Sequence, residues 1–111
     1  FLDAVRDTFG FDPPRHHGYD VVSAINAMAD GSAAVFVGMG GNFAAATPDT
    51  EFTERALQKC ALTVHVSTKL NRSHLCPGTE ALVLPCLGRS ERDLQATGPQ
   101  QGAGDTVSAR T

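Results

Sequence analysis

The sequence predicts an α/β domain in which layers of helices cover a small parallel sheet of about three strands. Two observations carry this prediction: short apolar runs rich in β-branched residues alternate with segments of helical spacing, and Gly-rich or polar loops follow the apolar runs. Strands that alternate with helices pair in parallel through crossover connections. We expect one domain over residues 1–97, followed by a disordered tail over residues 98–111.

Three segments carry the pattern of amphipathic helices. Residues 1–9 have apolar side chains at helical spacing. Asp20 is placed to cap a second helix, and Asp49 or Thr50 is placed to cap a third that runs to about residue 60.

Three apolar runs are the predicted strands, over residues 33–37, 61–66 and 81–84. The first is continuously apolar, which suits a strand buried on both faces of a parallel sheet. Residues 38–49 are expected to form a loop rich in Gly and Ala, and the polar residues 67–75 a short helix between the second and third strands.

The charge, the apolar runs and the cysteines of the sequence limit which partners and which cellular compartment we expect. The formal net charge of −3 argues against nucleic acid, because phosphate binding usually needs a basic patch. No apolar run reaches the roughly 20 residues that cross a bilayer. The three cysteines form no disulfide framework, which favours a reducing, cytoplasmic compartment. The sequence starts inside a helical pattern, so we expect it to be part of a longer chain.

Three loops are expected at one edge of the sheet, over residues 38–47, 67–71 and 85–89. In open parallel sheets, ligands bind beyond the carboxyl ends of the strands. These loops are richer in Gly, Ser, Thr and Asn than the rest of the chain, which is the composition that a nucleotide site needs.

The first loop opens with a glycine-rich turn. Gly40 and Gly41 lack Cβ, so their backbone can adopt positive φ and approach a phosphate closely, beside the amide of Asn42. A turn that only reverses the chain explains the same residues equally well. The dinucleotide pattern G-x-G-x-x-G begins at Gly38 but is not completed, because Phe43 stands where the third glycine belongs.

The second loop combines hydroxyl and amide groups with two cations. Ser67 and Thr68 are suited to bond a base or sugar, and Lys69 or Arg72 to pair with a phosphate. Helix capping beside solvated charges is the alternative explanation. The sequence contains no set of nucleophile, base and orienting group, and its four histidines lack the spacing of a metal site. We therefore assign no catalytic and no metal-binding residue.

Three blocks of sequence, taken together, resemble one enzyme family. They are residues 35–50 (VFVGMGGNFAAATPDT), 63–75 (TVHVSTKLNRSHL) and 80–89 (EALVLPCLGR). In this order and at this spacing they look like the formate-dehydrogenase-like branch of the molybdopterin oxidoreductases, and the similarity covers most of residues 1–100. The tail after Gln100 does not resemble the continuation of the family.

The resemblance implies a role in holding a cofactor. Members of the family are long enzymes that bind bis(molybdopterin guanine dinucleotide) with molybdenum or tungsten, usually with an iron–sulfur cluster near the N-terminus. This stretch is similar to the second of two Rossmann-like halves that grip the dinucleotides. The family's metal-ligating and cluster-binding residues belong to other parts of the chain, and Cys60, Cys76 and Cys86 do not match them. The cluster would therefore not be bound by this piece.

The resemblance also implies a set of cofactor-binding positions. The glycine turn falls where the family loop meets the phosphates, and Ser67 falls where many relatives have an Asp that recognises guanosine. Asn71 and Ser73 stand where relatives often have threonines, and Ala81 where many have Asp. The expected cofactor-binding residues are Gly38, Gly40, Gly41, Asn42, Ser67, Thr68, Asn71 and Ser73.

Two further interpretations stay open beside this one. The chain is alternatively a non-catalytic α/β module that recognises another nucleotide or a protein partner, or a remnant without a function of its own. A small parallel sheet needs helices on both faces. If the remaining domains of a parent chain normally cover one face, the isolated piece is expected to associate with itself.

Overall fold

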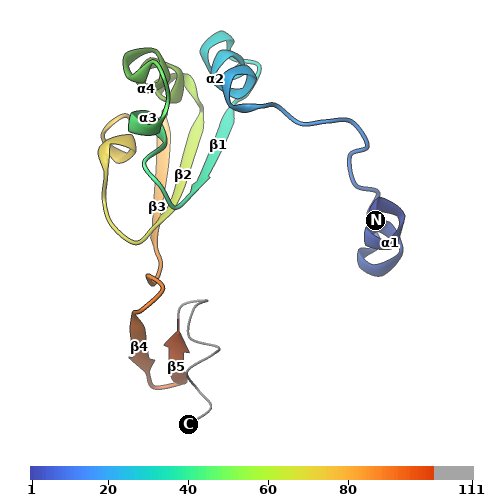
Figure 1. The fold of residues 1–111 in the computed structure, drawn as a ribbon, viewed down its shortest axis with the longest axis vertical. Helices are drawn as coiled ribbons and strands as arrows, with labels where there is room; N and C mark the ends of the chain where they lie inside the picture. The colour runs from blue at the N-terminus through green and yellow to red at the C-terminus, as the bar shows by residue number, and fades with distance from the viewer. Residues whose placement is uncertain (102–111) are drawn as a thin grey trace.

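The computed structural model describes residues 1–101, and a three-stranded parallel sheet lies in its main body together with the helices that pack on it (Figure 1). The strands β1 (Val35–Met39), β2 (Leu62–Ser67) and β3 (Glu80–Pro85) follow the order β1-β2-β3. Val64 of β2 lies opposite Val37 of β1 on one side and Leu82 of β3 on the other. The predicted α/β fold with about three parallel strands is confirmed.

The helices begin and end at residues suited to capping. They are α1 (Leu2–Phe9), α2 (Val21–Asp30), α3 (Phe43–Ala46), α4 (Thr50–Lys59) and the 3₁₀ helix η1 (Arg72–Leu75). The carboxylate of Asp20 accepts the Ser23 N–H at 2.8 Å, and that of Asp49 accepts the Phe52 N–H at 2.9 Å. Asp49 is therefore the cap of α4. None of the helices in residues 1–101 is long and apolar enough to cross a membrane.

Helix α3 lies where the sequence predicts only a loop. Its single turn is closed by a hydrogen bond from the Ala46 N–H to the Asn42 carbonyl at 2.9 Å. The Ala44 N–H donates to the hydroxyl of Ser73 at 2.9 Å. The sequence pattern missed α3 because the turn is too short to show helical periodicity, and a residue 29 positions away helps to hold it.

A β-hairpin follows the sheet, which corrects the boundary expected at residue 98. Strands β4 (Arg92–Gln95) and β5 (Gly98–Gln101) pair antiparallel across a two-residue turn. Four residues of the segment expected to be disordered thus form a strand, because a two-residue turn brings them back along β4, where their backbone pairs. The hairpin projects from the carboxyl end of β3 (Figure 1). The rest of the expected tail, residues 102–111, lies outside the described residues.

The helices that pack on the sheet do so on one face. Helices α2 and α4 pack on each other, and their buried side chains form the core with the sheet. The sheet contributes Phe36 from β1 and the buried Thr63 and His65 from β2. Helix α1 buries none of its residues and stands apart from this body (Figure 1).

The opposite face of the sheet is apolar and uncovered by the described residues. Val35, Val37 and Met39 of β1 are 56%, 60% and 80% exposed. The expectation that this strand is buried on both faces is therefore wrong for residues 1–101, because α2, α3 and α4 all lie on the other side. We call this surface the outer face; its residues are Val35, Val37, Met39, Leu62, Val64, Val66, Leu82 and Leu84.

We predict that the 111-residue chain self-associates through the outer face, because burying contiguous apolar surface is favourable by about 25 cal/mol per Å². Sedimentation equilibrium should give an average mass above 11.7 kDa that rises with concentration. Val37→Lys should return the mass to that of a monomer.

The matched control is Gln58→Lys, which adds the same charge at an exposed position on α4, away from the outer face. This control should associate like the unaltered chain. A monomer at every concentration, or equal effects of the two lysines, would contradict the prediction.

Candidate functional site

A pocket of about 210 Å³ lies at the carboxyl edge of the parallel sheet. Its lining comes from two loops, one that follows β1 and one that follows β2. The residues are Gly40, Gly41, Ser67, Thr68, Lys69 and Asn71. The loops meet because β1 and β2 run in parallel and end at the same edge. Five of the eight residues predicted to bind a cofactor, together with Lys69, are thereby brought into one lining.

The glycine turn needs glycine for its backbone conformation. Gly40 and Gly41 both have φ of +69°, and a Cβ at either position would meet nothing within 4 Å. A residue with a side chain would be disfavoured there by about 1–2 kcal/mol from backbone sterics alone. The Gly40 N–H donates to the Val66 carbonyl at 2.8 Å, which fixes the turn against β2. The turn therefore presents bare backbone to the pocket.

Gly38 has a different structural role. It lies within β1, and a Cβ there would come within 2.9 Å of the Phe36 ring. Its missing side chain makes room for that ring, opposite His65 of β2. Gly38 is not part of the pocket lining. The packing of Phe36 is enough to explain a glycine here, and contact between Gly38 and a phosphate stays a prediction.

Asn71 joins the two loops of the pocket. Its side-chain nitrogen donates to the Gly41 carbonyl at 2.8 Å, across 30 positions of sequence. Its side-chain oxygen accepts the Ser73 N–H at 3.0 Å and so caps η1. Both ends of this amide are thus bonded to the protein, and Asn71 ties the loop after β1 to the loop after β2.

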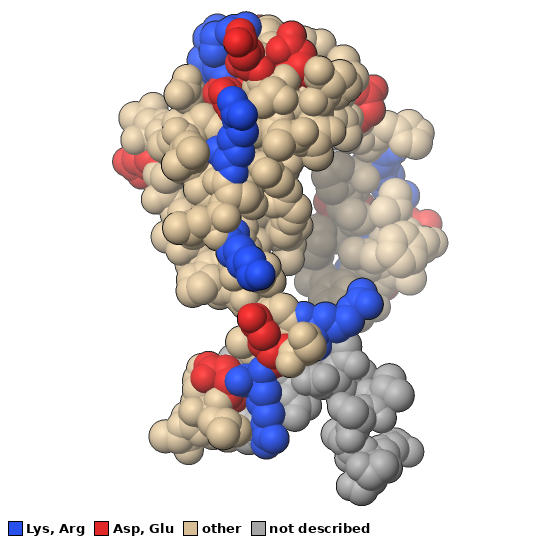
Figure 2. Space-filling view, turned by 60° about the vertical axis from the view of Figure 1, so that its left-hand side comes forward, with Lys and Arg blue, Asp and Glu red and all other residues tan. Residues whose placement is uncertain are grey.

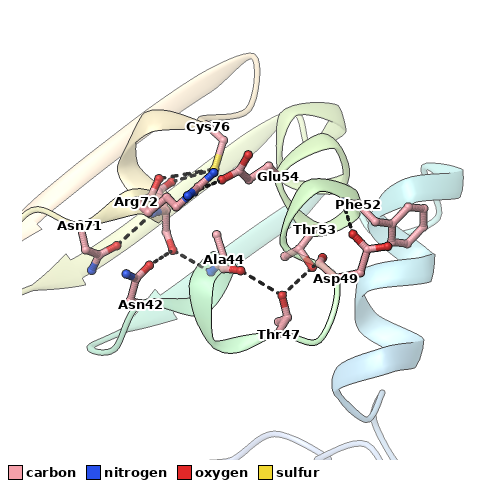
Figure 3. A network of polar contacts seen from close by, with 11 residues as sticks. Asn42, Ala44, Thr47, Asp49, Phe52, Thr53, Glu54, Asn71, Arg72 and Cys76 are labelled. Atoms are coloured by element: carbon pink, nitrogen blue, oxygen red, sulfur yellow. Dashed lines mark hydrogen bonds and ion pairs between the residues drawn. The ribbon is translucent and has the colours of Figure 1, made fainter.

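Ser73 and Asn42 lie beneath the pocket and outside its lining. The Ser73 side chain is 1% exposed, and its hydroxyl donates to the Asn42 side-chain oxygen at 3.3 Å. The same hydroxyl accepts the Ala44 N–H. Figure 3 shows these contacts continuing through Thr47 toward the cap of α4. The two residues hold η1 against α3 and support the loops from below.

Lys69 is the cation that the lining contains. Of the two cations considered for a phosphate, Arg72 forms an ion pair with Glu54 of α4 (Figure 3). The hydrogen bond to Glu54, and then its charge, raise the pKa of Arg72. Lys69 is exposed and lines the pocket. The sequence named both cations without separating them, because the choice depends on α4, which is remote along the chain.

The third loop expected at this edge supports the pocket without lining it. The Cys86 N–H, just past β3, donates to the Ser67 carbonyl at 3.1 Å. Ser67, the last residue of β2, is buried, and this bond holds its backbone from the side opposite the glycine turn. Residues 85–89 therefore act on the site through the position of Ser67.

The cysteines show no arrangement for redox or metal chemistry. Cys60 and Cys76 are buried and Cys86 is exposed, and all three are free thiols. Burial raises the pKa of the Cys60 and Cys76 thiols, which favours their protonated form. In residues 1–101, no group of three or more His, Cys, Asp or Glu side chains is placed to hold a metal ion.

Charge on the surface is mixed in sign. Figure 2 shows Lys and Arg side chains spaced apart among Asp and Glu on the face that it views, with wide uncharged areas between them. At the pocket, the basic group is that of Lys69, beside the hydroxyls of Ser67 and Thr68. This arrangement favours a small anion over an extended polyanion.

A stack of rings lies inside the fold, below the loops. Phe43 and Phe36 have ring centroids 5.0 Å apart, Phe36 and His65 5.6 Å, and His65 and His74 4.6 Å. Burial, and then the charge of His74, lower the pKa of His65. Both Nε2 atoms are buried without a hydrogen-bond partner in the described residues. A protonated His65 imidazole is therefore disfavoured in this stack.

The chain is similar to parts of much longer proteins. It is 64% identical over 95 residues to an uncharacterized oxidoreductase of Mycobacterium tuberculosis and to one of Mycobacterium bovis, covering 86% of this chain and 12% of theirs. It is 45% identical over 100 residues to protein YdeP of Escherichia coli strain CFT073, covering 90% of this chain and 13% of that protein. The chain thus spans about one eighth of the length of these curated relatives. No family model and no solved structure matches it.

We predict that stability falls in mild acid because of His65. Its pKa in the folded chain lies below the ordinary 6.5, so the unfolded chain binds the proton more readily. The contribution of neutral His65 to the free energy of unfolding is fully present above about pH 6.5 and is lost as pH falls toward the pKa of the folded chain. The midpoint of urea unfolding, measured from about pH 7.5 to 5.5, should decrease over this window.

His65→Leu should flatten this dependence, since it removes the titrating group from the stack. His16→Leu changes an exposed histidine in the loop before α2 and serves as the control, which should keep the slope of the unaltered chain. Parallel pH profiles for the unaltered chain and His65→Leu would refute the assignment.

Proposed function

We propose that this chain is the part of a molybdopterin guanine dinucleotide-dependent oxidoreductase that binds one end of the cofactor. The parent reaction would be a two-electron oxidation or reduction at molybdenum or tungsten, in an enzyme resembling formate dehydrogenase. The similarity to longer proteins named oxidoreductases supports the general class. The three sequence blocks that resemble the molybdopterin family support the cofactor.

One observation carries the proposal most directly. Two consecutive positive-φ glycines, Gly40 and Gly41, open onto the same pocket as Ser67, Thr68 and Lys69 at the carboxyl edge of a parallel sheet. Nothing within the described chain fills the space where their side chains would stand. Bare backbone beside hydroxyls and an ammonium group is the environment in which proteins bind a phosphate ester.

Each lining residue other than Asn71 would contribute a separate contact. Gly40 and Gly41 would let a diphosphate approach the backbone, and the Lys69 ammonium would pair with its charge. Ser67 and Thr68 would offer hydroxyls to the ribose or base. A hydroxyl at position 67 binds a guanine edge more weakly than a carboxylate would, because a neutral acceptor forms a weaker hydrogen bond.

The size of the pocket limits what this piece would hold. A volume of about 210 Å³ is smaller than the roughly 300–1,000 Å³ of sites that enclose a whole ligand. It fits a phosphate with part of a nucleoside, so the rest of the cofactor would contact the remaining domains of the parent. When bound, the cofactor would supply the redox-active metal, and the described residues would only bind and orient it.

The outer face supports the same proposal. Apolar side chains from all three strands, such as Val37, Val64 and Leu82, lie side by side on an uncovered surface of the sheet. Sheets built from parallel strands are normally covered on both faces. In a parent of the length of the curated relatives, another segment would pack there. The partners we propose are therefore the cofactor and the rest of the same polypeptide.

We predict that Gly40→Val and Gly41→Val each lower the cofactor content of the full-length parent. A Val side chain would strain or displace the turn that the cofactor approaches, and we expect roughly a tenfold loss of affinity, about 1.4 kcal/mol. Molybdenum or tungsten by mass spectrometry, and pterin by fluorescence, measure the occupancy of the purified protein.

Gly31→Val is the matched control for strain. Gly31 ends α2 with φ of +85°, a Cβ at this position would meet nothing within 4 Å, and the residue lies outside the pocket lining. The substitution should cost similar stability and leave the cofactor in place. If the unaltered parent purifies without metal and pterin under conditions that load related enzymes, the proposal fails and a binding module of another kind is favoured.

We predict that the isolated 111-residue chain binds GDP weakly, with a Kd of about 1 mM or higher, because it supplies only part of the contacts. Isothermal titration calorimetry of the chain with GDP is the measurement. Micromolar binding would show instead that this pocket is a complete nucleotide site.

A further inference from the structure

The glycine turn is linked to the stacked pair of His65 and His74 through one residue, Asn71. The Asn71 backbone N–H donates to His74 Nδ1 at 3.0 Å, and the Asn71 side-chain nitrogen donates to the Gly41 carbonyl at 2.8 Å. Asn71 is thus the single residue between the imidazole of His74 and the pocket mouth. A change in the bonding of His74 would therefore reach the turn through Asn71.

The contact at Nδ1 requires a neutral imidazole. A backbone N–H can only donate, so Nδ1 of His74 must be the acceptor and the ring proton must sit on Nε2. A proton on Nδ1 would face the proton on the Asn71 nitrogen. It would instead be drawn to the Asn71 carbonyl and side-chain oxygens, each 3.2 Å from Nδ1. That side-chain oxygen already accepts the Ser73 N–H.

Apart from the two Asn71 oxygens near Nδ1, no described group is placed to offset a positive charge on His74. Its ring packs against His65 of β2, which in turn packs against Phe36 of β1. Helix α3, which contacts η1, carries no titratable residue.

The remaining ionisable groups around η1 are Arg72, Cys76, Lys69 and, on α4, Glu51 and Glu54. Glu54 is committed to Arg72, and no carboxylate of the described residues lies within ion-pair distance of either imidazole. Protonation would therefore place a cation beside a second imidazole without a counter-charge.

We propose that His74 is a positioning residue for the glycine turn: when neutral it holds Asn71 against Gly41, and when protonated it releases the turn. The turn therefore responds to the gain or loss of one proton at this ring. At one pH unit below the midpoint, about a tenth of the molecules keep the held form, and ligand affinity at this edge falls roughly tenfold. That last consequence rests on the function proposed above, whereas the movement of the turn does not.

The movement is tested without any ligand by NMR of the ¹⁵N- and ¹³C-labelled chain between about pH 8 and 5. If the unaltered chain associates, Val37→Lys provides the background. At high pH, His74 should be the tautomer with its proton on Nε2. The amide resonances of Gly41 and Asn71 should shift with the same midpoint as the His74 ring. A proton on Nδ1 at high pH, or a Gly41 resonance that does not follow His74, would overturn the proposal.

Variants separate positioning from folding. His74→Asn provides a side-chain oxygen near the place of Nδ1 and cannot titrate, so Gly41 should keep its high-pH resonance throughout. His74→Leu removes the acceptor, and the Gly41 amide should have its low-pH chemical shift at every pH. His17→Asn removes an exposed histidine before α2 and should leave the titration intact. If His74→Leu does not fold, His74→Asn still decides: a Gly41 resonance that titrates in that variant as it does in the unaltered chain sinks the proposal.

The two proposals fail separately. If the parent proves to bind no molybdopterin cofactor, the expected response of the Gly41 resonance to pH in the ligand-free chain stays the same. If the parent binds its cofactor but the Gly41 resonance does not follow the protonation of His74, only the positioning role is refuted.

Discussion

The parallel pairing of β2 with both neighbours is the constraint on which the rest of the structure depends. Because β1, β2 and β3 run in one direction, the loops after β1 and β2 open at a single edge, and Cys86 after β3 braces Ser67 there. The same pairing divides the side chains of β2 between two surfaces. Thr63, His65 and Ser67 turn toward the helices, and the valines between them form the middle of the outer face. The pairing of β2 with β1 and β3 therefore determines the position of both the pocket and the outer face.

Local chemistry made most of the elements predictable from the sequence. Asp20 and Asp49 cap helices where their side chains suit that role, and each β-branched run became a strand within two residues of its expected bounds. The predictions that were wrong concern features that depend on contacts between residues far apart in the sequence. Helix α3 is held by Ser73, and the exposure of Val37 depends on where the helices gather. No periodicity in the sequence records either fact.

The candidate site divides in the same way. The sequence identified Gly40, Gly41 and Ser67 from residue type and from the edge they were expected to share, and these residues line the pocket. It could not separate Lys69 from Arg72, since Glu54 occupies the second through a helix remote in sequence. Nor could it show that Ser73 faces inward, or that His74 reaches the turn through Asn71. Residue type indicated the chemistry of the edge, and tertiary contacts decided which atoms remain available to a ligand.

The uneven distribution of buried side chains implies unequal local stability along the chain. Helix α1 has eight residues and buries none, and β4 and β5 pair only with each other in the described residues. Short helices and two-stranded hairpins are marginal in water without packing. Amide protons in both segments would exchange with solvent through local opening, whereas those of β2 would exchange only when the whole sheet unfolds. The glycine turn, whose Gly40 amide is bonded to β2, would share the slow exchange of the sheet even though it lies at its surface.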